Sequence, residues 1–411
     1  MKKENMSVQT SRSILVAGIF AFLVLVFAAR AQYPDWPHSG LVYILTTPEG
    51  ADLPASAAEK DFPLLVRLNK DWFDFSQAKP GGEDIRFASE AGTPLAFQIE
   101  QWDAAGGTAS IWVRIPEIRG NARQAIKLFW GNPGAGSEGN GKRVFGTDAG
   151  FAGVWHLGAD LEDSTPNNLN GTNNGSTHTA GIIGDGYVFG QKKGITIRQP
   201  GGKDDQKVTC MPSGNQDRSM SAWIYPTSYE GFNWAAATIG GWGGENRPGV
   251  GPGHTLSYMS MVGKGQLRFH FYGPDPRGAT SIPLRQWHHV ALSVSDDMVR
   301  FYIDGVLDQT IDPSGTKFTS IGALKTPAAT EVNVGNHERG SGPFNGSLDE
   351  VRFEGAARSA NWMKLCYENQ KPMQTVVGPL VQSGTDFSVS VKKITLKEGK
   401  SINVMAKAGG A

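Results

Sequence analysis

The sequence predicts an all-β protein with two antiparallel β-sandwich domains, followed by a short third block of strands. Apolar residues alternate with polar ones at a period of two in many short stretches, which is the pattern of half-buried strands. Turn residues separate these stretches, and the 411 residues include 53 Gly and 23 Pro. Because the short strands follow one another with turn signals between them, we expect antiparallel sandwiches rather than parallel βαβ units.

The N-terminus has the order of a secretory signal peptide. Lys2, Lys3 and Arg12 precede an unbroken apolar run from Ile14 to Ala29. The run is shorter than the ~20 residues that a helix needs to cross a bilayer, and Ala29-Arg30-Ala31 supplies small residues for a signal peptidase. We therefore predict that residues 1–31 are a cleaved signal peptide and that the protein is extracytoplasmic, in the periplasm, at the cell surface or secreted. The alternative is an uncleaved N-terminal anchor, which would be its contact with a membrane.

The charge balance and the cysteines narrow the class further. Lys+Arg and Asp+Glu number 39 each, so the formal net charge is zero. A nucleic-acid-binding protein normally carries a basic excess, and we expect no nucleic-acid partner. The 2 cysteines, Cys210 and Cys366, exclude a disulfide-dense scaffold. A disulfide between them is a prediction for an oxidising compartment, although sequence separation alone does not decide it.

The first domain, residues 32–150, contains the clearest alternation. One face of a strand carries Phe62, Leu64, Val66 and Leu68, and the other face carries Leu65, Arg67 and Asn69. The same alternation returns near residues 95–99, 111–115 and 126–130, with Gly, Pro and Asn in the gaps. These stretches predict an antiparallel sandwich.

The second domain, residues 151–370, opens with a strand over 152–157 and a polar loop over 160–175. A hairpin is predicted where alternating apolar residues over 290–294 and 299–303 flank Asp296-Asp297, with an Asp304-Gly305 turn after them. Ser359 is expected to cap a short helix that covers one side of the sandwich. One face of that helix would carry Trp362, Leu365 and Cys366.

The C-terminal part completes the predicted organisation. Residues 371–384 have the composition of a linker. Residues 385–411 form a third strand-like block, which is too short to fold alone.

Residues 151–370 resemble the LamG-like, concanavalin A-like jelly rolls. Four segments carry the resemblance in the family's order: Ser219 to Pro226 (SMSAWIYP), Gln286 to Ala291 (QWHHVA), Phe301 to Gly305 (FYIDG), and Phe344 to Phe353 (FNGSLDEVRF). The resemblance implies a jelly roll of two antiparallel sheets.

Residues 60–148 resemble a bacterial domain of unknown function, DUF2341. The segments that match it are Phe62 to Val66 (FPLLV), Asp84 to Phe87 (DIRF), Ile99 to Trp102 (IEQW) and Ile111 to Pro116 (IWVRIP). No function is assigned to that family. In the tail, Leu396 to Ser401 (LKEGKS) resembles the opening of an immunoglobulin-like domain, so that residues 385–411 would be partial immunoglobulin-like strands.

These resemblances imply a class of function without choosing a ligand, because jelly rolls carry lectins, adhesion modules and glycosidases on one scaffold. We expect a non-catalytic exported binding protein that recognises a glycan or a surface protein through its jelly roll. A structural or protein-partner component of a bacterial envelope assembly is the alternative, because domains like the first one occur beside TolQ/ExbB-type segments. A glycoside hydrolase is the second alternative, with carboxylates from Asp349, Glu350 and Glu354. We predict no catalytic residue, since Asp349 and Glu350 belong to the family's ordinary Asp-Glu-Val-Arg motif.

The polar loop of the second domain suggests calcium. Its hard oxygen donors are Asp160, Glu162, Asp163, Asn167, Asn168 and Asn170, without the glycine of an EF-hand loop. The family resemblance implies a structural calcium held by Asp163 and Asp349, with Asn170 as a further ligand. The alternative is a solvated loop whose side chains cap their own backbone.

The aromatic and histidine residues give the last candidates. Trp234 and Trp242 lie in the Gly-rich stretch 232–253 and are predicted to contact the ligand, because sugar rings stack on flat apolar surfaces. The alternative is a core position, which we expect for Trp223 and Trp287. His288 and His289 should point to opposite faces of a strand, so they do not suggest a shared metal, and His156 is expected to be a hydrogen-bonded core or edge residue.

Overall fold

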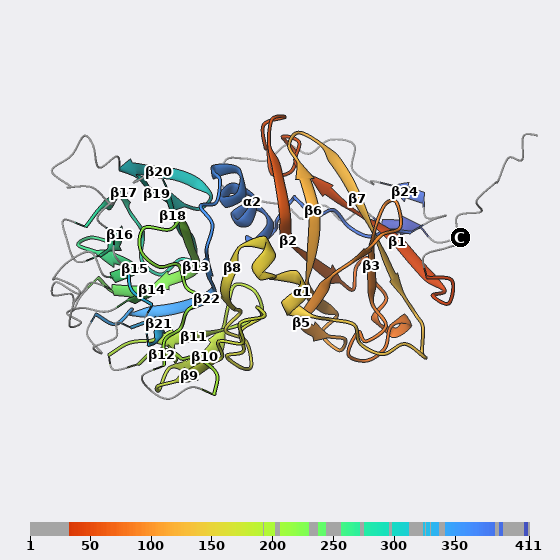
Figure 1. Ribbon diagram of the computed structural model, residues 1–411. Coiled ribbons are helices and arrows are strands. Elements are labelled where there is room, and N and C mark those ends of the chain that lie inside the picture. The colour runs from red at the N-terminus through yellow and green to blue at the C-terminus, as the bar shows by residue number, and fades with distance from the viewer. Residues whose placement is uncertain are drawn as a thin grey trace, which may run out of the picture. The chain divides into compact units, whose positions relative to one another are not determined.

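A computed structural model describes most of the chain (Figure 1). The described residues are 33–191, 193–201, 206–229, 237–243, 256–271, 275–295, 298–311, 324, 326–328, 330–336, 342–382, 386–388 and 407–409. Residues 1–31, the predicted signal peptide, lie outside this set. Among the described helices, none is long and apolar enough to cross a membrane.

The first sandwich consists of a five-stranded and a three-stranded antiparallel sheet. The larger sheet has the order β23-β1-β7-β3-β4, with β1 (His38–Leu45), β3 (Arg86–Ser89), β4 (Pro94–Leu95), β7 (Arg123–Trp130) and β23 (Val381–Gln382). The smaller one has the order β2-β6-β5, with β2 (Ala58–Asn69), β5 (Phe97–Asp103) and β6 (Thr108–Arg119). Short helical turns η1 (Phe75–Gln77), α1 (Gly141–Val144) and η2 (Thr147–Ala149) complete it. The predicted strands of this domain are therefore present.

Strand β2 is buried on both faces, which its alternation did not predict. Phe62 and Leu64 point into the sandwich core as expected, and both are fully buried. Leu65, on the opposite face, is also fully buried, because the helix α2 (Ala360–Gln370) packs against it. The Asn369 side chain accepts a hydrogen bond from the Leu65 backbone N–H (2.7 Å) and donates one to the Leu65 carbonyl (3.0 Å).

The jelly roll is built from two larger sheets. The eight-stranded sheet has the order β10-β11-β22-β13-β18-β19-β20, with β8 beside β22. Its strands are β8 (Phe151–Trp155), β10 (Thr177–Ala180), β11 (Asp185–Phe189), β13 (Arg218–Pro226), β18 (His288–Ser295), β19 (Met298–Ile303), β20 (Val306–Ile311) and β22 (Gly346–Glu354). The seven-stranded sheet has the order β17-β16-β15-β14-β21-β12-β9. Its strands are β9 (Gly171–Asn173), β12 (Ile195–Ile197), β14 (Ala237–Gly243), β15 (Leu256–Val262), β16 (Gln266–His270), β17 (Arg277–Ser281) and β21 (Val332–Val334).

The two faces of the eight-stranded sheet are both buried. One face shares a hydrophobic core with the seven-stranded sheet, through residues such as Met220, Leu292 and Phe353. The other face belongs to the core of the first sandwich, to which it contributes Ala291 and Tyr302. Figure 1 shows α2 between this sheet and strand β2 of the first sandwich. Residues 32–411 accordingly form one compact unit.

Helix α2 begins and packs as predicted. The Ser359 hydroxyl accepts a hydrogen bond from the Trp362 N–H (2.9 Å) and so caps the first turn. Trp362 and Leu365 are buried in the first-sandwich core. At the other end, the Trp223 indole N–H donates to the Gln370 side chain (2.8 Å), which ties the helix to strand β13.

The linker prediction was wrong for residues 376–382. Val376 and Leu380 are buried in the core of the first sandwich, and the Leu45 N–H donates to the Val376 carbonyl (2.7 Å). Strand β23 then pairs with β1 at the sheet edge. The chain therefore returns from α2 to complete the first sandwich, because these apolar side chains gain burial there. Further on, β24 (Asp386–Ser388) pairs with β25 (Lys407–Gly409), and the predicted immunoglobulin-like strands between them lie outside the described residues.

The predicted disulfide between Cys210 and Cys366 is also wrong. Both are free thiols. Cys366 lies in the core of the first sandwich, whereas Cys210 packs against the jelly-roll core. Burial raises the pKa of Cys366 to about 12 and that of Cys210 to about 11, so both stay protonated at neutral pH.

Candidate functional site

Trp242, a predicted ligand-binding residue, is a core residue. It is fully buried on β14, and its indole N–H donates to the Pro212 carbonyl (2.9 Å). Its ring packs against Phe353 at 5.4 Å between centroids. The prediction was wrong because the glycines around Trp242 belong partly to a core strand rather than to an exposed turn. The second predicted residue, Trp234, lies outside the described residues.

An aromatic pair that the sequence did not indicate lies at the end of the eight-stranded sheet. Tyr225 and Trp287 are both half-buried, with ring centroids 5.6 Å apart. Trp223, two residues before Tyr225, is buried as expected, but Trp287 is not a full core residue. The difference follows from position, because α2 covers Trp223 through Gln370 and Tyr367.

The residues predicted to hold calcium are engaged by backbone groups. Asp163 is buried and accepts hydrogen bonds from the backbone N–H groups of Val154, Thr165 and Leu169 and from the Thr165 hydroxyl. Asn170 accepts one from the Asp163 N–H (3.0 Å). These contacts match the alternative in which the loop caps its own backbone. Burial raises the pKa of Asp163 despite these bonds.

Asp349 is held in a similar way, by other segments. Its carboxylate accepts from the N–H groups of Ile182 (2.8 Å), Ile183 (3.0 Å) and Glu350 (2.8 Å). Burial and the neighbouring Glu350 raise its pKa well above the usual value. Binding of a structural calcium by Asp163, Asn170 and Asp349 stays a prediction, which a calcium titration would test.

A different cluster of ionisable side chains lies where the two sandwiches meet. We call Glu100, His156 and Glu350 the seam cluster. Glu100 comes from β5 of the first sandwich, His156 directly follows β8, and Glu350 lies in β22 of the jelly roll. One ligand-type atom from each lies within 4.8 Å of the others. Sequence patterns could not group them, because they come from three segments far apart in the chain.

Two β-bulges orient the side chains of Glu100 and Glu350 toward the seam between the two sandwiches. In β5, the register against β6 shifts between Ile99 and Gln101, so Glu100 is the extra residue. In β22, the register against β13 shifts beside Glu350, which has a positive φ of 51°. A bulge redirects a side chain that strict alternation would place elsewhere.

The seam cluster is closely connected. His156 Nδ1 lies 2.7 Å from Glu350 Oε1 and 3.5 Å from Glu100 Oε2. Arg352 donates to the second oxygen of Glu350 (2.6 Å), and the Trp112 indole N–H donates to Glu100 Oε2 (2.5 Å). His156 is buried and hydrogen-bonded, as the sequence predicted.

The surroundings shift the pKa values of Glu100 and Glu350 in opposite directions. Burial, Glu350 and Asp349 together raise the pKa of Glu100 well above its usual value. Burial alone would raise the pKa of Glu350 too, but His156 and Arg352 outweigh it and lower that pKa. Glu350 is therefore ionised at neutral pH, whereas Glu100 holds its proton to a higher pH than an ordinary glutamate does.

A cavity of about 490 Å³ adjoins the seam cluster. Glu100 and His156 line it together with Gln98, Lys142 and Glu162. The Glu100 side chain is 6% exposed and the His156 side chain is 9% exposed. The cavity thus reaches two of the three members of the seam cluster from outside.

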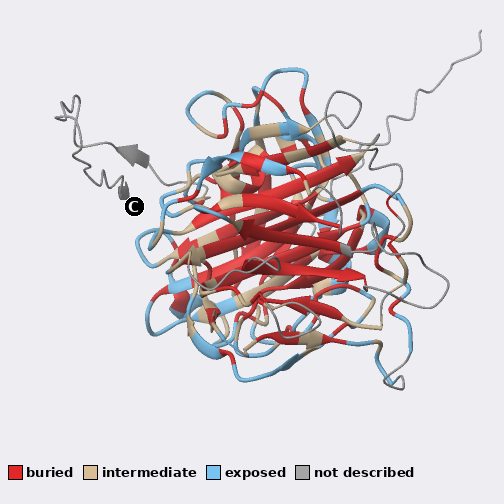
Figure 2. Ribbon diagram, turned by 90° about the vertical axis from the view of Figure 1, so that its left-hand side faces the viewer, coloured by how far each residue is buried: buried red, intermediate tan, exposed pale blue. Residues whose placement is uncertain are grey.

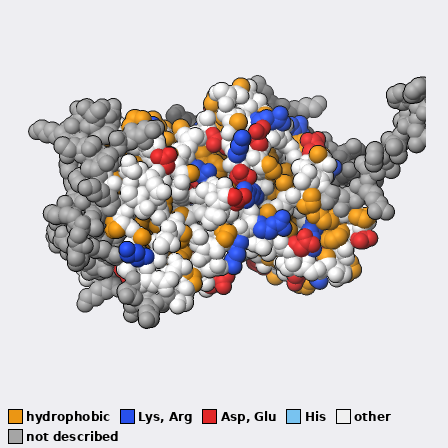
Figure 3. All heavy atoms as spheres, viewed as in Figure 1, with side chains coloured by type: hydrophobic (Ala, Val, Ile, Leu, Met, Phe, Trp, Pro, Cys, Tyr) orange, Lys and Arg blue, Asp and Glu red, His pale blue; other side chains and the backbone are white. Residues whose placement is uncertain are grey.

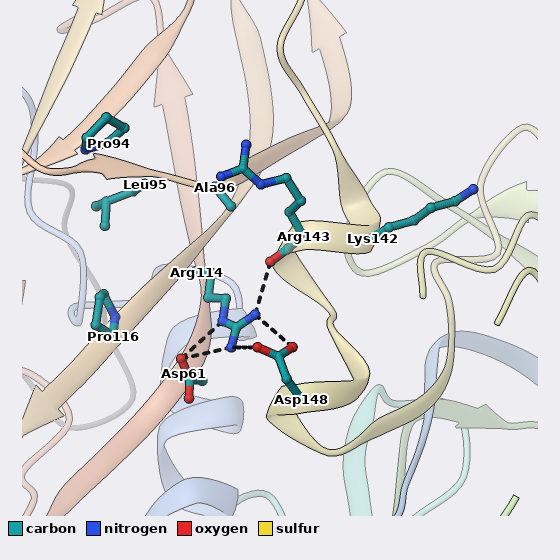
Figure 4. A pocket seen from close by; sticks show the side chains of 9 residues that line it. All are labelled: Asp61, Pro94, Leu95, Ala96, Arg114, Pro116, Lys142, Arg143 and Asp148. Carbon is teal, nitrogen blue, oxygen red and sulfur yellow. Dashed lines mark hydrogen bonds and ion pairs between the residues drawn. The ribbon is translucent and has the colours of Figure 1, made fainter. Parts of the chain in front are cut away.

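A second cavity, of about 410 Å³, lies on the first sandwich and is lined by charged residues (Figure 4). Arg114 occupies its centre and bridges Asp61 (3.0 Å) and Asp148 (2.8 Å). Hydrogen bonding to Arg114 lowers the pKa of Asp148. Figure 3 shows positive and negative side chains interspersed on one face of the molecule. Asp61, Arg114 and Asp148 are paired with one another, which is typical of a structural bridge.

The outer face of the seven-stranded sheet carries a continuous polar row. Figure 2 looks onto this side of the jelly roll and shows its strands as largely buried. Directly paired positions run across six strands, and the members of the row are Thr172, Thr196, Asn333, Gly241, Tyr258 and His270. Asn333 donates to the Tyr258 hydroxyl (3.2 Å), and His270 Nδ1 lies 2.6 Å from Asp275 Oδ2. A Cβ at Gly241 would lie 2.6 Å from the Tyr258 ring, so glycine is required there for the ring to fit.

The fold defines an all-β protein of two sandwiches, the second a concanavalin A-like jelly roll. Comparison with family models agrees: residues 200–364 match the Concanavalin A-like lectin/glucanases superfamily, and residues 81–156 match the Domain of unknown function DUF2341. Both families, in this order, are those that the sequence motifs predicted. A search of the curated proteins finds no match.

Several solved structures are similar over about half of the chain. Domain 4 of AbnA, a GH43 extracellular arabinanase from Geobacillus stearothermophilus in complex with arabinotriose, is 24% identical, with a TM-score of 0.38 over 52% of this chain and 97% of that one. The botulinum neurotoxin serotype C1 binding domain is 12% identical, with a TM-score of 0.39 over 55% of this chain and 53% of that one. These similarities are too weak to support an argument about function.

Proposed function

We propose that the protein is an exported, non-catalytic binding protein that recognises a glycan through the outer face of the seven-stranded sheet. The observation that carries this proposal is the difference between the two outer faces of the jelly roll. The eight-stranded sheet is closed by α2 and the first sandwich, since Ala291 and Tyr302 lie in their shared core. Among the described residues, the seven-stranded sheet contributes no member to that core.

The chemistry of the polar row suits a glycan. Hydroxyl and amide groups at Thr196, Asn333 and Tyr258 can both donate and accept hydrogen bonds, as sugar hydroxyls require. Thr172 is exposed and Thr196 is half-buried, so one end of the row is accessible, while Tyr258, His270 and Asn333 are buried. The family match to concanavalin A-like lectins supports the same class of ligand.

The surroundings of Asp349 and Glu350, the carboxylates considered for glycoside hydrolysis, support a binding function rather than a catalytic one. A glycosidase needs two carboxyl groups that face the substrate. Asp349 and Glu350 are both buried. Three backbone N–H groups bind Asp349, and His156 and Arg352 bind Glu350.

Retention on a panel of immobilised polysaccharides tests the proposal. The chain from Gln32 onward is compared with the Asn333→Ala and Thr196→Ala variants. We expect each variant to bind about fivefold more weakly, because one hydrogen bond contributes roughly 1 kcal/mol. Thr108→Ala, at an exposed threonine of the first sandwich, is the matched control and should bind like the wild type.

The runner-up function is that of a protein-binding component of a bacterial envelope assembly. The structure favours it in one respect, because the first sandwich is fused to the jelly roll through α2 rather than tethered by a flexible linker. Equal retention of all variants, or retention on no polysaccharide, would overturn the glycan proposal and leave this one.

A further inference from the structure

We infer that Glu100, His156 and Glu350 form a binding site for a divalent transition metal such as Zn²⁺, at the seam between the two sandwiches. This inference does not depend on the proposed glycan function. The three donors are one imidazole nitrogen and two carboxylate oxygens. Zinc takes this donor set readily, with three protein ligands and a water in the fourth position.

The spacing of the donors fits a small ion. Ligand atoms of a tetrahedral zinc site lie roughly 3.3 Å apart, given bonds of about 2.0–2.1 Å. His156 Nδ1 lies 3.5 Å from Glu100 Oε2 and 2.7 Å from Glu350 Oε1. Admitting an ion therefore requires His156 and Glu350 to separate by a few tenths of an ångström.

Glu350 and His156 are also held by a second partner through their other polar atom, whereas Glu100 is held through the oxygen that lies nearest His156. The Trp112 N–H binds Glu100 Oε2, Arg352 binds Glu350 Oε2, and His156 Nε2 lies 3.4 Å from Gln98 Oε1. Metal ligands are typically oriented in this way, with the remote atom of each ligand bound to an outer residue. The arrangement leaves Glu350 Oε1 and His156 Nδ1 directed to each other, with Glu100 Oε2 beside them.

Glu100 supplies an independent indication of a ligand. Its Oε1 atom is buried and has no hydrogen-bond partner among the described residues. The whole side chain is only 6% exposed. A buried carboxylate oxygen without a partner costs free energy. A cation at the seam would satisfy it and offset the repulsion between Glu100 and Glu350.

The backbone is shaped to bring these side chains together. Both carboxylates lie at β-bulges, and Glu350 has a backbone conformation that L-residues rarely adopt. Bulges and positive φ values concentrate at functional sites, where the surrounding fold maintains them. The cavity lined by Glu100 and His156 gives an ion an entry path and room for a water ligand.

The site differs from the predicted calcium loop in its chemistry. Calcium takes 6–8 oxygen ligands, whereas the seam offers a nitrogen and two carboxylates. Because the seam ligands come from both sandwiches, a bound metal would join the first sandwich to the jelly roll. We therefore expect it to raise the stability of the whole unit.

Metal titration of the chain from Gln32 onward tests the inference. After treatment with a chelator, we expect one equivalent of Zn²⁺ to bind in calorimetry and to raise the thermal midpoint. Co²⁺, which has visible absorption bands, should give the spectrum of a four-coordinate nitrogen and oxygen site. Glu100→Gln keeps an acceptor for Trp112 and removes one ligand, so it should abolish the Co²⁺ spectrum and the midpoint shift.

Two further variants separate a site from an unspecific effect. Glu162→Gln changes an exposed glutamate that lines the same cavity, and it should bind Zn²⁺ like the wild type. Trp112→Phe removes the hydrogen bond that positions Glu100 and should weaken Zn²⁺ binding by about 10–100-fold. The inference is overturned if the wild type takes up no metal, or if Glu100→Gln takes up the same amount as the wild type. A Glu100→Gln variant that melts higher than a wild type unaffected by Zn²⁺ would also overturn it, and would assign the cluster to a proton-sharing network.

Discussion

The two outer faces of the jelly roll have the same strand alternation and different surroundings. On the eight-stranded sheet, the outward positions Trp223 and His289 are buried beneath α2 and the first sandwich. On the seven-stranded sheet, the outward positions Thr196 and Asn333 belong to a polar row outside that interface. The comparison shows that the outward residues of a sandwich become core residues once another domain packs on them. The closed face holds the two domains together, and the other face is the one that we propose for the ligand.

The largest effect on stability is expected for Trp242, which lies in the core between the two sheets of the jelly roll. Trp242→Ala should lower the free energy of unfolding by about 3–5 kcal/mol, because it leaves a large cavity in the core. Urea denaturation of the variant measures this change. Trp287→Ala, at a half-buried tryptophan, is the matched control. Unchanged stability of Trp242→Ala would mean that this ring lies at a surface, as the sequence first suggested.

The buried His289, on the covered face of the eight-stranded sheet, should make stability depend on pH. Burial lowers the pKa of His289 to about 4, with a further contribution from Arg352, whereas an unfolded histidine has a pKa near 6.5. Between these values the unfolded chain binds more protons, so stability falls as the pH drops from about 6.5 to 4. The loss attributable to His289 is on the order of 3 kcal/mol. In His289→Phe, denaturation at several pH values should show a smaller slope across this window, and an equal slope in both proteins would contradict the assignment.

The contact between α2 and the first sandwich should contribute less. Asn369→Ala leaves the buried N–H and carbonyl of Leu65 without their side-chain partner, which should cost about 2 kcal/mol. Chemical denaturation provides the measurement. Asn361→Ala, at a half-buried asparagine of the same helix, should change the free energy of unfolding by less than half as much. Equal effects of the two variants would show that Asn369 does not join the domains.

The smallest effect is expected at the margin of the closed face. Trp287→Ala should change stability by about 1 kcal/mol or less, since its ring is only half-buried beside Tyr225. We expect its retention on a polysaccharide to stay within about twofold of the wild type, whereas Asn333→Ala loses about fivefold. A larger loss for Trp287→Ala would move the proposed glycan surface to this aromatic pair.

Most of the predicted secondary structure was confirmed, because it depends on local patterns. The alternation at Val290, Leu292 and Val294 gave strand β18, which pairs with β19 as a hairpin. Ser359 gave the start of α2. The predicted site was less accurate, since Trp242 was assigned from the glycines around it. Those glycines allow a strand as well as a turn, and neighbouring strands decide between the two.

The sequence by itself determined the all-β class, the order of the two families and the position of α2. Strand periodicity and a helix cap depend on residues close together in the chain, so they can be read locally. Tertiary structure alone decided that Leu65 is buried, that residues 376–382 return to the first sandwich, and that Glu100, His156 and Glu350 meet. These features depend on packing between distant segments and on bulges that shift the strand register, and neither leaves a periodic signal in the sequence.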